Sequence, residues 1–470
     1  MQQTRPDGPA AVPAPDPRGA RDTGDGPAAY GAVAEAACGY WGRRGLPTEP
    51  GQVVVAPTAP LLLLALLAAA GPEPETVGRE DGGGVVLPRP GPAWHADQAR
   101  LLGRPLHPVP VPAECGGVPD PFALLETVGR ARAAGGDPRA LLLSVADGLT
   151  GTAAPPELLH EVCEAAVQED LLIISDESWR DTSHDPHDTV IVSPAEILHR
   201  PARHTGAGTH AHTVHAAHTL RARADAPHGV RGAYGRSPGA TDEGGDHDCV
   251  VVLVDLGADP EYAFRPGTAM GVARLPATGR GRELCERTRA VLTALRARPR
   301  GRDTTAAAEA LGEAEPLREH RAAGNRAHAA RAAALHRVLT AAGAVCRPPH
   351  AGRHLYPDFE ALRPALAARG IEDALRLEAE LVRRLGPYAL GGHRFGDDPR
   401  ALRVRLSTDV PSADVPSTVV PSTDASADGT TADGSAGARA SLETALRELT
   451  AGGPAAPHPV KSPDADGSPA

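Results

Sequence analysis

Lysine is nearly missing from this sequence. The only one is Lys461, in the polar residues 453–470. Arginine supplies the remaining basic charge, and 59 acidic residues leave a formal net charge of −11. Nucleic-acid binding depends on clustered basic surface that releases counterions, so this balance argues against a nucleic-acid partner. No concentrated basic run resembles a polybasic membrane anchor either.

Aromatic residues and cysteine pairs are also scarce. Aromatics make up 3% of the chain, so alanine, valine and leucine must fill most of the core. The six cysteines lie far apart without a CxxC pair, which indicates reduced thiols. The longest apolar run, residues 61–70, is too short to cross a bilayer and too far along the chain for a signal peptide. We therefore expect a cytoplasmic protein.

Strand-like and helix-like stretches alternate along the first 260 residues. Strands are predicted at residues 53–55, 85–87, 107–111, 141–145, 171–175, 190–193 and 250–254. Helices are predicted at residues 30–45, 61–70, 94–102, 122–134 and 156–168. Continuous apolar strands between helices are typical of a parallel sheet covered on both faces, so the expected fold class is α/β.

Breaks in this pattern give the expected domain organisation. Residues 1–27 are predicted to be disordered, residues 28–300 to form a large domain, and residues 301–452 to form a smaller α+β domain. Two stretches without hydrophobic period, 200–246 and 409–438, are predicted to be disordered insertions, and 453–470 a disordered tail. After the second insertion a short helix is expected at residues 441–449, with Ser441 as its N-cap.

The strongest chemical signal is Asp176-Glu177-Ser-Trp179, which directly follows a buried apolar strand. Ligands of α/β folds bind at the carboxyl ends of parallel strands, so an acid there is a candidate site residue. Taken alone, the Asp/Glu pair would fit a solvated strand end equally well.

Four motifs in chain order resemble those of the class I/II aminotransferases, enzymes of the pyridoxal phosphate (PLP) fold type I. Asp176-Glu177-Ser-Trp179 resembles the family's D-E-x-Y. The remaining matches are Pro92-Ala-Trp94 to P-x-W, Gly148-Leu-Thr-Gly-Thr152 to N-P-T-G-T, and Arg403-Val-Arg405-Leu-Ser407 to the R-L-S strand. The resemblance implies a large domain with a mostly parallel sheet, amino-group transfer between an amino acid and a 2-oxo acid, and a homodimer.

The resemblance also implies a role for each matched residue. Asp176 would hold the pyridine nitrogen protonated, and the indole of Trp94 would stack on the ring. Gly148 and Trp179 stand where the family has an asparagine and a tyrosine beside the cofactor. Arg405 would grip the substrate α-carboxylate, with Arg403, on the same strand face, as the fallback.

The departures from the family pattern concern catalysis itself. In the stretch Asp255-Leu-Gly-Ala258, Ala258 takes the place of the Schiff-base lysine, and no other lysine lies within the fold. Without an amine there is no covalent link to PLP, and the α-proton shuttle is missing too. Ordinary transaminase turnover is therefore doubtful, and any PLP or pyridoxamine phosphate (PMP) would bind non-covalently.

The expected phosphate contacts are also eroded. In the family's G-x-R the arginine is Ala269 here, and Arg265 is the candidate substitute. Where the family has a glycine turn into a helix N-terminus, this chain has Thr58 and then Pro60, which lacks an N–H. Both changes remove donors that a phosphate group needs.

A histidine-rich run falls in the first predicted insertion. Its members are His204, His210, His212, His215 and His218. The spacing could bind a metal, but a compositional loop without fixed geometry is the favoured interpretation, so no metal site is predicted.

Three functional interpretations stay open. The first is a degenerate aminotransferase-like protein that binds PLP, PMP, an amino acid or a 2-oxo acid weakly. The second is a PMP-dependent enzyme without a lysine, which would need a histidine near Ala258. The third is a non-enzymatic regulatory or scaffolding dimer.

Overall fold

The computed structural model describes residues 27–71, 83–112, 115–199, 248–258, 269–410 and 430–450. The predicted disordered N-terminal segment, except Pro27, the first insertion with its five histidines, and the tail at 453–470 lie outside the described residues. Arg265 lies outside them as well.

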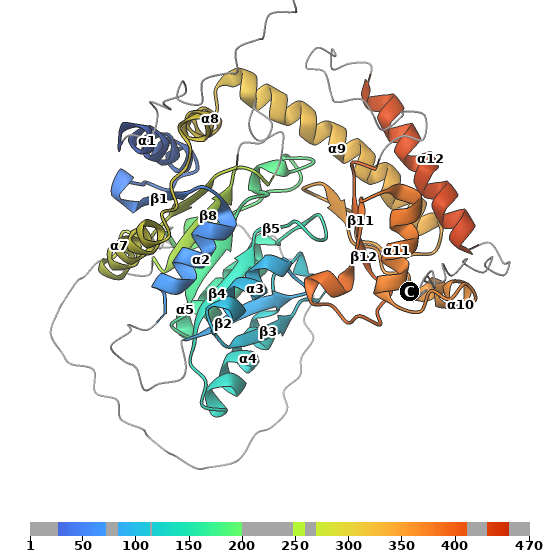
Figure 1. The fold of residues 1–470 in the computed structure, drawn as a ribbon, viewed down its shortest axis with the longest axis horizontal. Helices are drawn as coiled ribbons and strands as arrows, with labels where there is room; N and C mark the ends of the chain where they lie inside the picture. Colours follow the sequence, from blue (N-terminus) through green and yellow to red (C-terminus); the bar gives the residue numbers. More distant parts are fainter. Residues whose placement is uncertain are drawn as a thin grey trace, which may run out of the picture.

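A seven-stranded sheet forms the centre of the larger part (Figure 1). Its strands are β1 Val53–Ala56, β2 Gly84–Arg89, β3 Leu106–Pro110, β4 Pro138–Ser144, β7 Leu172–Asp176, β8 Val250–Asp255 and β9 Gly271–Arg274. Their order is β1-β9-β8-β7-β4-β2-β3, in which only β9 runs antiparallel to its neighbours. The α/β prediction with a mostly parallel sheet is confirmed, whereas the four-residue β9 was not expected.

Helices cover both faces of this sheet because its strands are apolar on both sides. They are α1 Pro27–Arg43, α2 Ala59–Ala69, α3 Ala93–Leu101, α4 Pro121–Ala133, α5 Pro156–Gln168, α6 Pro194–His199, α7 Gly279–Ala294 and α8 Gly301–Gly312. Alternate residues of β8 serve the two layers: Val250 and Val252 pack towards α1, α4, α5, α6 and α8, and Val251 towards α2, α3 and α7. No helix of the described residues has the length and hydropathy to cross a membrane.

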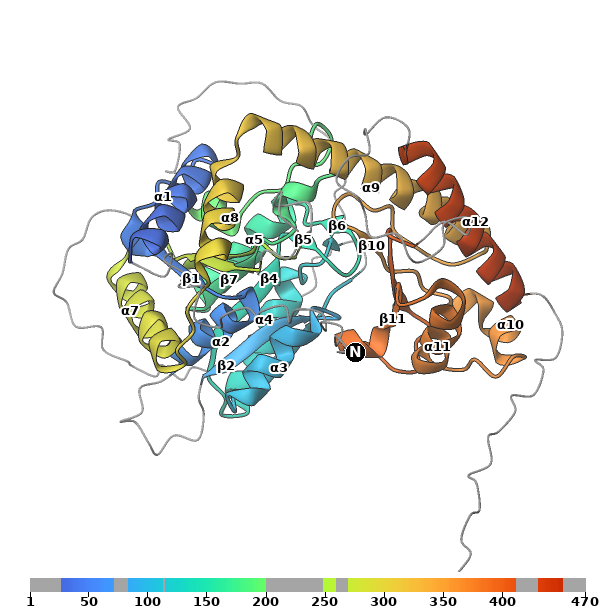
Figure 2. The same ribbon diagram turned by 45° about the horizontal axis from the view of Figure 1, so that its top comes forward.

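A second core follows along the chain, around a three-stranded antiparallel sheet of order β10-β12-β11. Its elements are α9 Glu315–Ala341, β10 His354–Leu355, α10 Arg363–Ala367, α11 Ala374–Leu385, β11 Ala389–Gly391, β12 Val404–Ser407 and α12 Thr430–Thr450. The long helix α9 belongs to both cores, with Leu317 in the first and Leu335 and Leu339 in the second (Figure 2). The change of core therefore lies within α9, later than the expected boundary at residue 300.

Two local predictions were wrong. Residues 190–193 do not form a strand, because the Ser193 hydroxyl accepts from the Ala195 N–H at 3.1 Å and leads the chain into α6. The last helix begins at Thr430 instead of Ser441, so residues 430–438 are helical and Ser441 is no N-cap. The apolar residues of α12 that pack on the second core, such as Leu442 and Leu446, all follow Ser441, and only they gave a signal in the sequence.

Candidate functional site

Asp176 stands at the carboxyl end of β7, as the sequence predicted for a site acid. Its Oδ1 accepts hydrogen bonds from the Ser178 backbone N–H at 3.0 Å and from the Ser178 hydroxyl. That hydroxyl oxygen in turn accepts from the Asp255 N–H, at 2.9 Å, at the end of the neighbouring strand β8. Ser178 therefore joins two carboxylate-bearing strand ends.

The imidazole of His95 is the second neighbour of Asp176. His95 is 3% exposed, and its Nε2 lies 3.4 Å from Asp176 Oδ2. Burial raises the pKa of Asp176, but His95 and the Ser178 hydrogen bonds outweigh it and hold that pKa below its ordinary value. Asp255 shows the opposite: burial and the negative charge of Asp176 raise its pKa to about 6, against a hydrogen bond from the Gly257 N–H.

Trp94 and His95 begin helix α3, and they take different positions there. The indole of Trp94 packs against the core beneath α2 and α3, with its ring edge-on to His95 at 4.2 Å between centroids. Successive helical residues point about 100° apart, so the two rings leave the helix in different directions. The sequence assigned Trp94, through the P-x-W motif, to stacking on a cofactor ring, and that role stays a prediction. His95 was missed, although an imidazole beside a motif aromatic was a usable signal.

Ala258 ends the turn after β8, in the position expected for a Schiff-base lysine. Its N–H donates to the Asp255 carbonyl at 3.3 Å, while the Gly257 N–H donates to the Asp255 carboxylate at 2.8 Å. No lysine lies among the described residues, because the only one is Lys461. The site offers no amine for covalent attachment.

The N-terminus of α2 is closed by the protein itself. Thr58 caps it by accepting from the Leu61 N–H at 3.3 Å, and Pro60 has no N–H to offer. Gly271 of β9 packs so closely that a Cβ there would lie 2.7 Å from the Ala59 nitrogen. Backbone donors that could hold a phosphate at a helix N-terminus are therefore engaged or covered.

The cation that would complete a phosphate site is also missing from the described residues here. Ala269 is exposed and carries no charge. Asp176 keeps a carboxylate suited to a pyridinium nitrogen, but the described residues place no matching donor at the phosphate end. This donor set does not fit PLP held as a covalent, phosphate-anchored cofactor.

The loop of the hairpin β5 Ala146–Asp147 and β6 Thr152–Ala153 forms a second part of the site. The Asp147 carboxylate accepts from the Leu149 N–H at 2.9 Å and the Thr150 hydroxyl at 2.7 Å, which shapes the loop. At Gly148 a Cβ would lie 2.5 Å from Nε1 of Trp179. The indole thus occupies the space that a side chain at position 148 would need.

Trp179 also contacts the second core, through the strand β10. Its ring meets that of His354 edge-on, with 5.8 Å between centroids. Burial is the main cause that lowers the pKa of His354 to about 3, and the positive charges of Arg405 and Arg353 lower it further. The ring is therefore neutral, and its buried Nδ1 has no hydrogen-bond partner in the described part of the chain. Sequence reasoning gave no signal for His354.

Arg405 lies in the middle of β12, on the same strand face as Ser407, and Ser407 is paired with His354 of β10. Its guanidinium lies 5.0 Å from the ring centre of Phe395 and makes no hydrogen bond or ion pair within the described residues. Burial lowers the pKa of Arg405, and the charge of Asp147 opposes that shift. Arg405 is half-buried and has no salt-bridge partner there.

Arg403 forms two ion pairs instead. It donates to Asp358 at 2.8 Å and pairs with Asp397 at 3.1 Å. The two arginines share a strand face, but only the guanidinium of Arg405 has no hydrogen bond or ion pair within the described residues.

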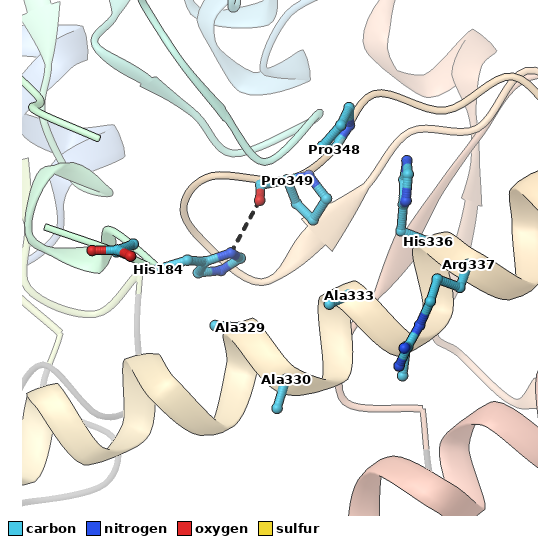
Figure 3. Close-up of a pocket in the computed structure, with 10 residues that line it drawn as sticks. His184, Ala329, Ala330, Ala333, His336, Arg337, Pro348 and Pro349 are labelled. Atoms are coloured by element: carbon cyan, nitrogen blue, oxygen red, sulfur yellow. Dashed lines mark hydrogen bonds between the residues drawn. The ribbon is translucent and has the colours of Figure 1, made fainter. Parts of the chain in front are cut away.

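A cavity of about 780 Å³ lies against α9 (Figure 3). Its lining contains none of the residues that the sequence singled out. His184 lines it, with Nε2 at 2.9 Å from the Gly352 carbonyl and Nδ1 at 3.3 Å from that of Pro349. Among the described residues, no cluster of three or more His, Cys, Asp or Glu side chains could hold a metal ion.

Comparison with known proteins gives a match at the level of structure only. No family model and no curated protein matches the sequence. Among solved structures, aspartate aminotransferase from Thermus thermophilus with maleate is similar at 18% identity and a TM-score of 0.60, over 89% of this chain and 81% of that one. The aromatic aminotransferase from Pyrococcus horikoshii is similar at 16% identity and 0.60, over 89% and 84%.

A third similar structure is a probable N-succinyldiaminopimelate aminotransferase, also from Thermus thermophilus, at 18% identity and a TM-score of 0.59. It is matched over 90% of this chain and 85% of its own. At such identities the likeness speaks for the fold. The chain thus has the α/β architecture of the aminotransferases, the PLP fold type I.

Proposed function

We propose that this protein binds a small α-carboxylate ligand, an amino acid in the first place, non-covalently and without ordinary transamination. The observation that carries the proposal is Arg405, a half-buried guanidinium without a hydrogen bond or ion pair in the described residues. A buried charge without a partner is costly, so such a fork is best explained by an anion that completes it. Two parallel N–H···O bonds to a carboxylate suit its geometry.

His354 favours an amino acid over a 2-oxo acid. The ring is neutral and its buried Nδ1 has no hydrogen-bond partner in the described residues, so in one of the two tautomers this nitrogen is available as an acceptor. An α-ammonium or α-hydroxyl group can donate to that lone pair, whereas an α-carbonyl cannot. We therefore expect amino and hydroxy acids to bind more tightly than the matching oxo acids.

Binding of PLP or PMP belongs to the proposal only as a weak, non-covalent event. Asp176 supports it, since a carboxylate there would stabilise a protonated ring nitrogen. The alanine at position 258, the capped start of α2 and the neutral Ala269 oppose it. A homodimer and a cytoplasmic location, both expected from the sequence, remain part of the proposal.

Calorimetric titration tests the ligand-binding function. Amino acids, the corresponding 2-hydroxy and 2-oxo acids, PLP and PMP are titrated into the wild type, Arg405→Ala and Arg403→Ala. Loss of a charge-assisted pair costs about 1.5–3 kcal/mol, so Arg405→Ala is expected to weaken carboxylate binding roughly ten- to hundredfold. Arg403→Ala is the matched control and is expected to keep the affinity, because that guanidinium is already paired within the protein.

Two outcomes would contradict the proposal. If nothing binds at millimolar concentration, a non-enzymatic scaffold becomes the better interpretation. If ligands bind but Arg405→Ala leaves the affinity unchanged, the site lies elsewhere.

A PMP-dependent enzyme without a lysine is the second candidate, and His95 is the observation in its favour. This imidazole is buried beside Asp176, with its Nε2 3.4 Å from Asp176 Oδ2. Titration of PMP into wild type and His95→Ala separates the candidates. PMP binding that is tight in the wild type and lost in the variant would support the enzyme.

A further inference from the structure

The cavity against α9 is a groove with an apolar floor and charged ends. Helix α9 contributes the methyl groups of Ala329, Ala330, Ala333 and Ala334 to its lining, and Pro348 and Pro349 form the facing wall (Figure 3). Its volume of about 780 Å³ lies within the range of about 300–1,000 Å³ that small-ligand sites occupy. A ligand with an apolar body would find small, flat contacts along its length.

The histidines of the groove are engaged with the backbone. Both ring nitrogens of His184 face carbonyl oxygens, those of Pro349 and Gly352. Nε2 of His336 lies 3.0 Å from the Cys346 carbonyl. These side chains hold the walls together, so ligand recognition in the groove depends on its other polar groups.

Arg337 is the cationic group of the groove that remains available. It is exposed, and its guanidinium makes no hydrogen bond or ion pair inside the described ranges. Figure 3 shows it at the end of the groove away from His184. Asp185, next to His184 in the chain, is an exposed acid on the groove lining. The two ends of the groove therefore carry opposite charges.

We propose that this groove is a second ligand site, which takes an amphipathic anion: a carboxylate or sulfonate with an apolar body. The anionic group pairs with Arg337, and the apolar body lies along the alanine floor between the proline wall and α9. Charge complementarity sets the orientation, because Asp185 repels an anion from the opposite end. The site is independent of Arg405, which is not among the residues that line it.

Fluorescence titration of the full chain tests this site with two probes. 8-Anilino-1-naphthalenesulfonate is the amphipathic anion, and N-phenyl-1-naphthylamine is a neutral probe of similar ring size. Ala333→Trp fills the groove from an exposed helix position and is expected to abolish binding of both. Arg337→Ala removes a solvent-exposed ion pair, so it is expected to weaken the sulfonate about two- to fivefold and leave the neutral probe unchanged.

Arg326→Ala is the matched control, since Arg326 is exposed on the same helix and does not line the groove. It is expected to leave both titrations unchanged. Circular dichroism of each variant checks that α9 remains folded. Sulfonate binding that persists in Ala333→Trp, or that is equally tight with and without Arg337, would overturn the proposal. Absence of any saturable binding by the wild type would overturn it as well.

Discussion

Replacing Gly148 with alanine would place a methyl group where the indole of Trp179 already lies. The added Cβ would be 2.5 Å from Nε1 and 2.9 Å from Cδ1, whereas ordinary contacts begin near 3.4 Å. The indole would have to withdraw by about 0.9 Å, the difference between 3.4 and 2.5 Å. It has little room, because Gly352 and the His354 ring lie against it. Overpacking of this kind typically costs about 1–3 kcal/mol of unfolding free energy.

A double-mutant cycle isolates this contact. Urea unfolding of the wild type, Gly148→Ala, Trp179→Ala and the double variant gives four free energies of unfolding. We expect Gly148→Ala to cost about 1–3 kcal/mol beside Trp179 and close to nothing beside Ala at that position. Gly51→Ala is the control, because a Cβ there meets nothing within 4 Å. An equal cost of Gly148→Ala in both backgrounds, or no cost in either, would refute the assigned packing.

Four further predictions concern neighbouring parts of the site. Because the Thr58 hydroxyl caps α2, Thr58→Ala is expected to lower the free energy of unfolding by about 0.5–2 kcal/mol, and Thr58→Ser is expected to leave it unchanged. Equal free energies of unfolding in urea for the wild type and Thr58→Ala would exclude the cap. The Asp255 carboxyl keeps its proton up to about pH 6 in the folded state, whereas in the unfolded chain it loses the proton near pH 4. As the pH rises from about 4 to 6, the free energy of unfolding of the wild type should therefore fall relative to that of Asp255→Asn, by up to about 3 kcal/mol. Parallel pH profiles of unfolding would contradict this. Incubation with PLP and borohydride should leave no pyridoxyl group on residues 28–408, and peptide mass spectrometry that finds one there would refute the missing amine. Ala258→Lys should restore neither colour nor activity, since Thr58 caps the start of α2 and position 269 carries no charge; tight PLP binding by that variant would show otherwise.

Local patterns in the sequence were sufficient for most of the large domain. Helix α5 has the predicted bounds, and the strands β1, β2, β4, β7 and β8 lie within a few residues of the predicted ones. Continuous apolar runs and helix-end residues depend on neighbours in the chain, so they are readable without the fold. The motif order also led to the correct fold type, which the similar solved structures support.

Short or displaced elements escaped the same reasoning. β9 has four residues, and its place between β1 and β8 depends on hydrogen bonds to strands far away in sequence. Residues 190–193 have strand-like composition, but β8 takes the place beside β7. A pattern of apolar residues indicates that a segment is buried, but it does not show which strand or helix the segment packs against.

The sequence by itself determined what the site lacks: no lysine can stand near position 258, and no arginine stands at 269. Only the tertiary structure decided which residues meet. It places Nε2 of His95 3.4 Å from Oδ2 of Asp176 and leaves Arg405 without a hydrogen bond or ion pair in the described residues. The residue type at a position can be read from the sequence, whereas a hydrogen bond or ion pair joins two positions that lie far apart along the chain. Asp358 and Asp397 engage Arg403 from different loops, and that geometry exists only after the second core has folded.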